Sequence, residues 1–117
     1  MEEKTKSKAK PVEKKKEPEP TLEHLELLLS EEYELTRPLK IKVHHYNDGT
    51  VMVESVELNL YAEGNSDYDA LNNFSQVLVE QLEDLQDFQK QGKRLGRDLR
   101  IQMDLLQRLM KKTGTRR

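Results

Sequence analysis

VESVELNLYAEGNSDYDAL, residues 53–71, changes its hydrophobic period part-way along its length. Its first half alternates apolar and polar side chains, which is typical of a half-buried β-strand, and its last residues begin a helical spacing. Gly64-Asn65-Ser66 lies between the two halves. Gly64 can adopt backbone conformations closed to other residues, and Ser66 is a preferred helix N-cap residue. The stretch therefore predicts a strand, a tight joint and a capped helix.

The segment before this stretch predicts a β-hairpin. Residues 39–46, LKIKVHHY, alternate apolar and polar side chains, and Asn47-Asp48-Gly49-Thr50 follows them. Asp and Gly tolerate the positive φ angles that tight hairpin turns require. In the return strand, Val51 and Val53 fall on the face opposite Met52. With residues 58–63 as a third strand, the sequence predicts a three-stranded antiparallel meander with one aliphatic face.

The helix that follows is predicted to cover this aliphatic face. Its apolar residues recur at three- and four-residue intervals, so they form one stripe along the helix. The predicted fold class is α+β, in the order β-β-β-α, with a short N-terminal helix and a C-terminal basic helix added to it. The stripe consists of Leu71, Phe74, Leu78, Leu82, Leu85 and Phe88.

The leucine repeat continues beyond the reach of the sheet. A single helix from Ser66 to Lys112 would be about 70 Å long. Either Gly92 and Gly96 break it into two helices, or its distal half packs on another subunit. Because glycine costs about 1 kcal/mol inside a helix, a break or kink is favoured. Both alternatives leave an apolar stripe that needs a partner, and we predict oligomerisation through Leu95, Leu99, Met103, Leu106 and Leu109.

The N-terminal third of the chain divides into two parts. Residues 1–20 hold Lys, Glu and Pro with few apolar side chains, and are predicted to be a disordered tail. Residues 21–36 place Leu22, Leu25 and Leu28 at helical spacing after Thr21, and are predicted to form a short helix. The predicted parts are this tail (1–20), the Leu-rich helix (21–36), a β-β-β-α domain (37–90) and a basic amphipathic helix with its tail (91–117).

Composition excludes several classes of protein. The chain has 117 residues, no cysteine, 34% hydrophobic residues and 36% charged residues. Without cysteine it can form neither disulfides nor thiol-based active sites. No apolar run approaches the length of a membrane span, and the N-terminus lacks the apolar core of a signal peptide. The sequence predicts a cytoplasmic protein that does not bind membranes.

Charge is strongly segregated along the chain. Residues 17–36 carry seven Glu and neither Lys nor Arg, whereas residues 90–117 carry ten basic and two acidic residues. Such asymmetry indicates contact with polyanions at the ends, with basic partners in the middle, or between copies of the chain. Solvated surface without a specific partner is the remaining alternative.

The sequence offers no constellation for catalysis. His44 and His45 are adjacent in a predicted strand, so their side chains point to opposite faces and cannot chelate one ion. Asp67 and Asp69 are explained by the helix N-terminus, and the first strand supplies no carboxylate to a two-metal site. We therefore predict no enzymatic activity, no metal and no cofactor.

The basic C-terminal segment predicts one of two interactions. Its cations lie on an amphipathic stretch, and neutralisation of phosphates by such a face would give salt-sensitive binding of nucleic acid, either DNA or RNA. The same cations could instead pair with the acidic middle of a second subunit. The candidate nucleic-acid residues are Lys93, Arg94, Arg97, Arg100, Arg108, Lys111 and Lys112.

The stretch from the hairpin to the helix resembles the HicB-like antitoxin family. The resemblance lies in the valine-rich strand of residues 51–56, the Val56-Glu57-Leu58 segment, the Glu63-Gly64-Asn65-Ser66 joint and the helix opening at Asp69-Ala70-Leu71. With the flanking elements it covers residues 39–88. It implies a partial RNase H-like fold without nuclease activity that binds and blocks a small RNA-cleaving toxin, usually as a dimer or higher oligomer. Many members of the family add a C-terminal DNA-binding module, and no such module is evident in this sequence. A fourth strand after the helix is not evident either.

Together these features predict a non-enzymatic, oligomeric HicB-like protein, of the antitoxin type or a related regulatory module, that binds a protein partner. The alternatives are a nucleic-acid-associated protein that uses its basic helix, and a structural oligomerisation module. The partner is predicted to contact the sheet face that lies opposite the aliphatic one. The residues predicted to bind it are His44, Tyr46, Met52, Glu54, Tyr61 and Glu63.

Overall fold

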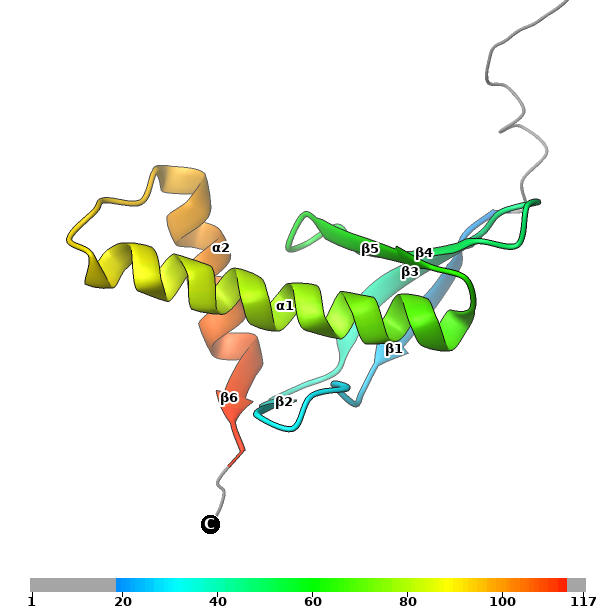
Figure 1. The fold of residues 1–117 in the computed structure, drawn as a ribbon, viewed down its shortest axis with the longest axis horizontal. Coiled ribbons are helices and arrows are strands. Elements are labelled where there is room, and N and C mark those ends of the chain that lie inside the picture. Colours follow the sequence, from blue (N-terminus) through cyan, green and yellow to red (C-terminus); the bar gives the residue numbers. More distant parts are fainter. Residues whose placement is uncertain (1–18, 114–117) are drawn as a thin grey trace, which may run out of the picture.

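A four-stranded antiparallel sheet lies at the centre of the computed structural model, which describes residues 19–113 (Figure 1). Strands β1 (Thr21–Leu25), β3 (Leu39–His45), β4 (Val51–Ser55) and β5 (Leu60–Gly64) are hydrogen-bonded in that spatial order. Helix α1 (Asp67–Lys90) crosses one side of the sheet, and helix α2 (Arg97–Leu109) folds back across α1. The α+β class predicted from the sequence is confirmed.

The hairpin between β3 and β4 forms at the predicted turn. Gly49 has φ +95°, a conformation that L side chains rarely adopt. The backbone N–H and the hydroxyl of Thr50 donate hydrogen bonds to the Asp48 carboxylate, at 3.0 and 2.7 Å. These bonds favour the charged carboxylate, and they lower the pKa of Asp48 below its ordinary value. The turn sets the register in which Val43 lies opposite Val53.

The prediction of a short helix over residues 21–36 is wrong. This segment forms β1 and, after a connection, the short strand β2 (Tyr33–Leu35). β1 pairs with β3 as an edge strand, so that Leu25 lies opposite Leu39. Of the two leucines in β1, Leu25 is buried, with 8% of its surface exposed, and Leu22 is 65% exposed. An extended strand on the free edge of β3 gains the docking surface that an isolated short helix would lack.

The joint between β5 and α1 has the predicted Ser66 cap, but Gly64 does not adopt a positive φ. The hydroxyl of Ser66 accepts a hydrogen bond from the backbone N–H of Asp69 at 3.1 Å, as an N-cap residue does. Gly64 lies so close to the first turn of the helix that a Cβ at this position would come within 2.6 Å of the Cβ of Asp69. The joint therefore requires glycine for close approach, and it fixes the angle at which α1 leaves the sheet.

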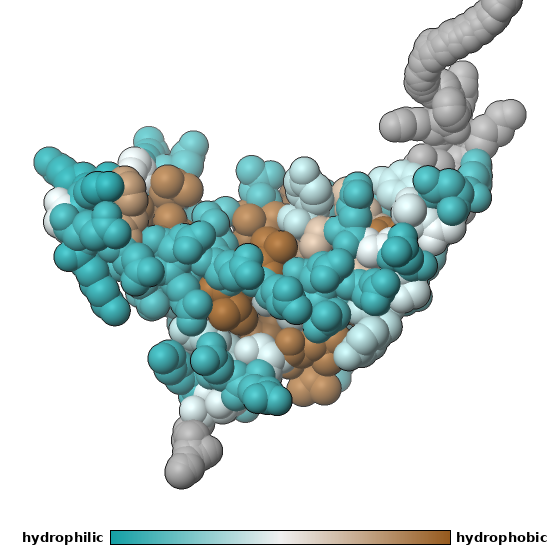
Figure 2. Space-filling model, in the orientation of Figure 1, coloured by the Kyte–Doolittle hydropathy of each residue, from teal (hydrophilic) through white to brown (hydrophobic). Residues whose placement is uncertain are grey.

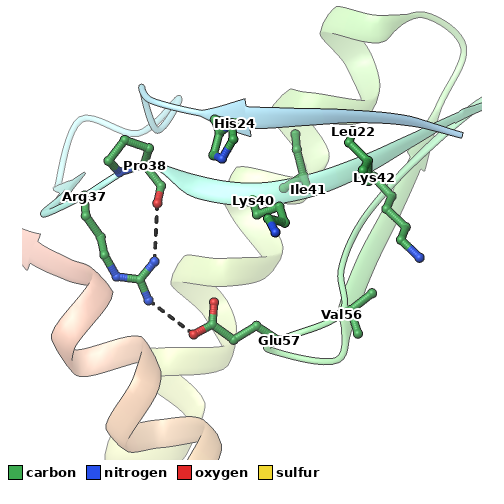
Figure 3. Close-up of a pocket in the computed structure, with 9 residues that line it drawn as sticks. All are labelled: Leu22, His24, Arg37, Pro38, Lys40, Ile41, Lys42, Val56 and Glu57. Atoms are coloured by element: carbon green, nitrogen blue, oxygen red, sulfur yellow. Dashed lines mark hydrogen bonds and ion pairs between the residues drawn. The ribbon is translucent and has the colours of Figure 1, made fainter.

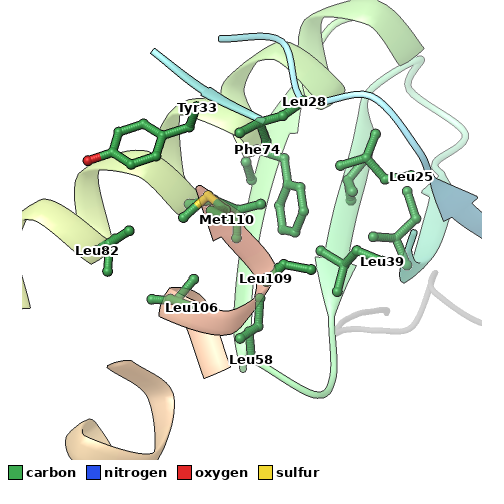
Figure 4. Packing of buried hydrophobic residues seen from close by; sticks show 14 of the residues in the cluster. Leu25, Leu28, Tyr33, Leu39, Leu58, Phe74, Leu82, Leu106, Leu109 and Met110 are labelled. Atoms are coloured by element: carbon green, nitrogen blue, oxygen red, sulfur yellow. The ribbon is translucent and has the colours of Figure 1, made fainter. Parts of the chain in front are cut away.

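Helix α1 covers the aliphatic face with the predicted stripe. Phe74 and Leu78 are fully buried, whereas Leu71 is partly buried and Phe88 lies at the exposed end. In Figure 4, Phe74 points toward the strands, where the aliphatic side chains of β3 and β4 lie. Figure 2 shows mainly hydrophilic side chains along the outer side of α1.

The long leucine repeat is broken after Lys90, and the alternative of one continuous helix is wrong. Gly92 has φ +80°, and α2 begins only at Arg97. The chain reverses, so α2 packs on α1 and leads into β6 (Met110–Lys112), which pairs with β2. Gln102 fixes this arrangement by donating to the carbonyl of Leu58 at 2.7 Å and accepting from the side chain of Gln81 at 2.6 Å.

The apolar stripe of α2 is therefore buried within the chain itself. Leu106 is fully buried in the same core as Phe74, and Leu99 is 42% exposed. The sequence predicts that this stripe requires a second subunit, and the reversal at Gly92 removes that requirement. The four predicted oligomerisation residues that lie in the chain's own core are Leu95, Met103, Leu106 and Leu109.

Candidate protein-binding site on the uncovered sheet face

The side of the sheet opposite α1 is a face that no described helix covers, and we call it the uncovered face. Alternation along each strand decides which residues it receives, because neighbours in a strand point to opposite sides. In β4, for example, Val51, Val53 and Ser55 are buried toward α1 while Met52 and Glu54 are only half-buried. The uncovered face consists of Leu22, His24, Lys40, Lys42, His44, Met52, Glu54, Tyr61 and Glu63.

Charge divides this face between its two halves. β1 and β3 contribute His24, Lys40 and Lys42, whereas β4 and β5 contribute Glu54 and Glu63. The strand register places Leu22 opposite Lys42, Lys42 opposite Glu54, and Glu54 opposite Tyr61. One row across the sheet is therefore apolar, basic, acidic and aromatic in turn, and we call these four residues the central row.

Five of the six predicted partner-binding residues lie on the uncovered face, on β3, β4 and β5, and Tyr46 follows β3 directly. Met52 lies opposite His44 on one side and opposite Glu63 on the other. His44 Nε2 and Glu54 Oε1 are 2.7 Å apart and form a hydrogen bond. The rings of His44 and Tyr46 stack with centroids 6.3 Å apart. Tyr61 projects from the edge strand and is 62% exposed.

A groove lies beside the basic half of the face (Figure 3). Its volume is about 540 Å³, and in Figure 3 the helices lie behind the strands, so the groove opens on the uncovered side. At one end, Arg37 Nη2 forms an ion pair with Glu57 Oε2 at 3.3 Å. Val56, directly after β4, is 65% exposed. The groove is lined by Leu22, His24, Arg37, Pro38, Lys40, Ile41, Lys42, Val56 and Glu57.

This groove is not among the features predicted from the sequence. The helical spacing of residues 21–36 places Leu22 and His24 in a helix, and the contact of Arg37 with Glu57 joins residues that are far apart in the sequence. The signal in the sequence that could have predicted this strand was the alternation in Thr21-Leu22-Glu23-His24-Leu25. It fits a strand with Leu22 and His24 on one face. That interpretation would have placed both residues on a strand face, like Lys40 and Lys42.

The candidate nucleic-acid residues do not form one helix face. Lys93 precedes α2 and lies over the ring of Phe88, and Lys111 and Lys112 belong to β6. Several of these cations already have partners: Arg108 pairs with Asp104 at 2.9 Å, Lys111 pairs with Glu34 at 3.6 Å, and Lys112 lies over the Tyr33 ring. Arg94, Arg97 and Arg100 are exposed. The basic segment is thus divided between the loop, α2 and β6.

The histidines and carboxylates bond in separate pairs. His44 bonds to Glu54, and His45 Nε2 lies 2.8 Å from Asp67 Oδ1. The two imidazoles are therefore directed to different carboxylates. Within residues 19–113, no group of three or more His, Asp or Glu side chains could hold a metal ion.

Comparisons with protein-family models, with curated proteins and with solved structures gave no match to this chain. The resemblance to HicB-like antitoxins therefore stays a prediction that depends on the residues quoted for it. The fourth strand of the sheet is β1, which precedes the hairpin. In the part of the chain that the structure describes, neither α1 nor α2 is long and apolar enough to span a membrane.

Proposed function

We propose that this protein is a non-enzymatic binding module that recognises a protein partner through the uncovered face of its sheet. The observation that supports this most is the exposure of large apolar side chains on that face. Leu22 and Val56, which line the groove beside that face, and Tyr61, on its opposite edge strand, are each more than 60% exposed. An antiparallel sheet with one solvated face needs only polar side chains on it, so large apolar side chains left exposed at both edges of this face favour an interaction site.

The acidic half of the face is the part that contacts the partner in this proposal. Tyr61 provides an amphipathic ring, the kind of side chain that is enriched at protein interfaces and often carries much of their binding energy. Glu54 lies opposite Tyr61 on the neighbouring strand, and Glu63 lies two residues further along β5. A basic partner would be attracted by these carboxylates, which would speed encounter and fix orientation more than they would add affinity.

The resemblance to HicB-like antitoxins suggests the class of partner. Members of that family bind small RNA-cleaving toxins, and a protein that binds RNA phosphates carries basic side chains. We therefore propose an antitoxin-type role in which the uncovered face binds such a toxin. A gene for a small basic protein beside the gene of this chain is expected, and a solitary gene would contradict the antitoxin form of the proposal.

The test is a calorimetric titration of that small basic protein into purified variants of this chain. Tyr61→Asp and Glu63→Lys are expected to weaken binding at least about tenfold each, because they remove the aromatic anchor or reverse a charge at the contact. Tyr68→Asp is the matched control, since Tyr68 is 66% exposed on α1, on the other side of the sheet. Equal affinity of Tyr61→Asp and Tyr68→Asp would contradict the proposed site.

A further inference from the structure

The central row of the uncovered face is complementary to itself. Across the sheet its residues are Leu22 on β1, Lys42 on β3, Glu54 on β4 and Tyr61 on β5. A two-fold axis that runs parallel to the strands, midway between β3 and β4, lays the row of one copy on the same row of a second copy in reverse order. Lys42 then meets Glu54 of the second copy, and Leu22 meets Tyr61.

We propose that two copies of this protein pair through their uncovered faces about this axis. Each contact occurs twice, as a two-fold interface requires, so two Lys42–Glu54 pairs form between the copies and two apolar contacts flank them. Sheets pack face to face about 10 Å apart with their strands within about 30° of each other, and the near-parallel strands of this arrangement satisfy that geometry.

The groove beside Leu22 gives the apolar contact a defined place. Leu22, Lys42 and Val56 are among the residues that line it, and its volume of about 540 Å³ leaves room for a side chain of a second copy. Under the two-fold axis, β5 of the second copy lies over β1, so its Tyr61 lies over Leu22 at this groove. The aromatic ring that projects from one edge of the sheet thus fills the hollow at the other edge.

Charge favours a second copy over anionic occupants of this face. A nucleic acid or an anionic membrane would be attracted by Lys40 and Lys42 but repelled by Glu54 and Glu63 on the same surface. An acidic partner would meet the same obstacle. The central row carries one positive and one negative charge at equal distances from the axis. The same row of a second copy, in reverse order, therefore places opposite charges together.

The size of the face indicates a weak pair. Four strands about 4.8 Å apart and about five residues long cover roughly 300 Å² in projection, whereas a stable complex buries about 800 Å² on each partner. The pair is therefore expected to separate on dilution. The inference goes beyond the proposed function: a protein that binds the acidic half of the face has to displace the second copy first.

The experiment is analytical ultracentrifugation of the full-length chain, alone, at rising concentration. The wild type is expected to approach twice its 13.8 kDa chain mass. Lys42→Glu and Glu54→Lys each place like charges against each other across the axis, so each variant alone is expected to remain monomeric. Lys90→Glu, at the exposed end of α1, is the matched control and is expected to associate as the wild type does.

Mixing the two monomeric variants provides the decisive outcome. In a mixed pair, the new carboxylate at position 42 of one chain would face the new ammonium at position 54 of the other. The unsubstituted Glu54 and Lys42 would face each other at the second contact, so both contacts between copies become attractive again. Restored dimer is the expected result, and it also shows that both variants are folded. Within each variant the two cross-strand neighbours carry like charges, so only contacts between chains can produce the rescue.

Three results would overturn the inference. One is a wild-type chain that stays monomeric up to about 1 mM. Another is a mixture of Lys42→Glu and Glu54→Lys that stays monomeric. The third is association of the single variants as strong as that of the wild type. The toxin is absent from this experiment, and Lys42 is outside the proposed toxin contact. A chain that does not pair with itself would therefore leave the proposed function unaffected. A chain that binds no toxin would likewise leave the proposed pairing unaffected.

Discussion

The two faces of the sheet are built from the same strands but have opposite character. On the face that α1 covers, Val53 and Ala62 are 0% and 7% exposed. On the uncovered face, their neighbours Glu54 and Tyr61 are a half-buried carboxylate and a largely exposed ring. Each strand thus supplies two separate surfaces, one that is buried in the core and one for which we propose recognition, so a substitution should affect only the surface on which its residue lies.

Replacing Phe74 with alanine is the largest test of this difference. The ring is fully buried between α1 and the strands, so Phe74→Ala is expected to lower the free energy of unfolding by about 3–5 kcal/mol. Tyr61→Ala, on the other face, is expected to change it by less than about 0.5 kcal/mol. Urea unfolding followed by circular dichroism measures both values. Similar losses for the two variants would mean that Tyr61 also belongs to the core.

The same comparison can be made on α2. Leu106 is fully buried and Leu99 is 42% exposed. Leu106→Ala is expected to cost about 2–5 kcal/mol of unfolding free energy, at any protein concentration, because its contacts lie within one chain. Leu99→Ala is expected to cost less than about 1 kcal/mol. A loss at Leu106 that diminishes as protein concentration rises would instead indicate a contact between chains.

Gly64 tests the joint that orients α1 over one face. Alanine at this position would place its Cβ within 2.7 Å of the carbonyl carbon of Asp69. Since backbone must move to relieve this contact, Gly64→Ala is expected to cost about 1–3 kcal/mol of unfolding free energy. Gly96→Ala is the control, because a Cβ at Gly96 meets nothing within 4 Å. Equal urea midpoints for the two variants would show that the joint tolerates a side chain.

The smallest expected effect concerns Tyr33, which is buried against α1 and is 4% exposed. Burial raises the pKa of its hydroxyl above 10.0, and the carboxylates of Glu83 and Glu32 raise it further. The folded chain thus holds this proton more tightly than the unfolded chain does. The stability that results is present below about pH 10 and is lost as the pH rises above it.

The ultraviolet absorbance of tyrosinate measures this shift. Because the pKa of Tyr33 is raised, its ionisation is expected to add a phase at high pH to the titration of the wild type, and Tyr33→Phe is expected to remove that phase. An unchanged titration curve for Tyr33→Phe would contradict the burial of its hydroxyl against Glu83.

Local signals in the sequence were sufficient for the elements that end at short-range turns. The Asp48-Gly49 turn and the Ser66 cap depend on residues within a few positions of one another, so both could be predicted. The state of residues 21–36 could not, because leucines at 22, 25 and 28 fit a helix equally well. Their extended conformation depends on the free edge of β3, which lies many residues away in the chain.

The site shows the same division between local and distant causes. Alternation along β3, β4 and β5 placed His44, Glu54 and Tyr61 on one face, as predicted. The basic half of the face depended on β1, whose position follows from pairing and not from spacing. The sequence shows that the α2 stripe needs a partner, but the chain reversal at Gly92 that supplies this partner within the same molecule could not be decided from the residues alone.

We propose that the uncovered face of the sheet binds a protein partner, whereas the covered face holds the core. Calorimetric titration of Tyr61→Asp with the small basic protein that we expect to be encoded beside this chain separates these two roles. We predict binding at least about tenfold weaker than to the wild type, in a variant whose urea unfolding midpoint is unchanged. Binding equal to that of the wild type would contradict the account.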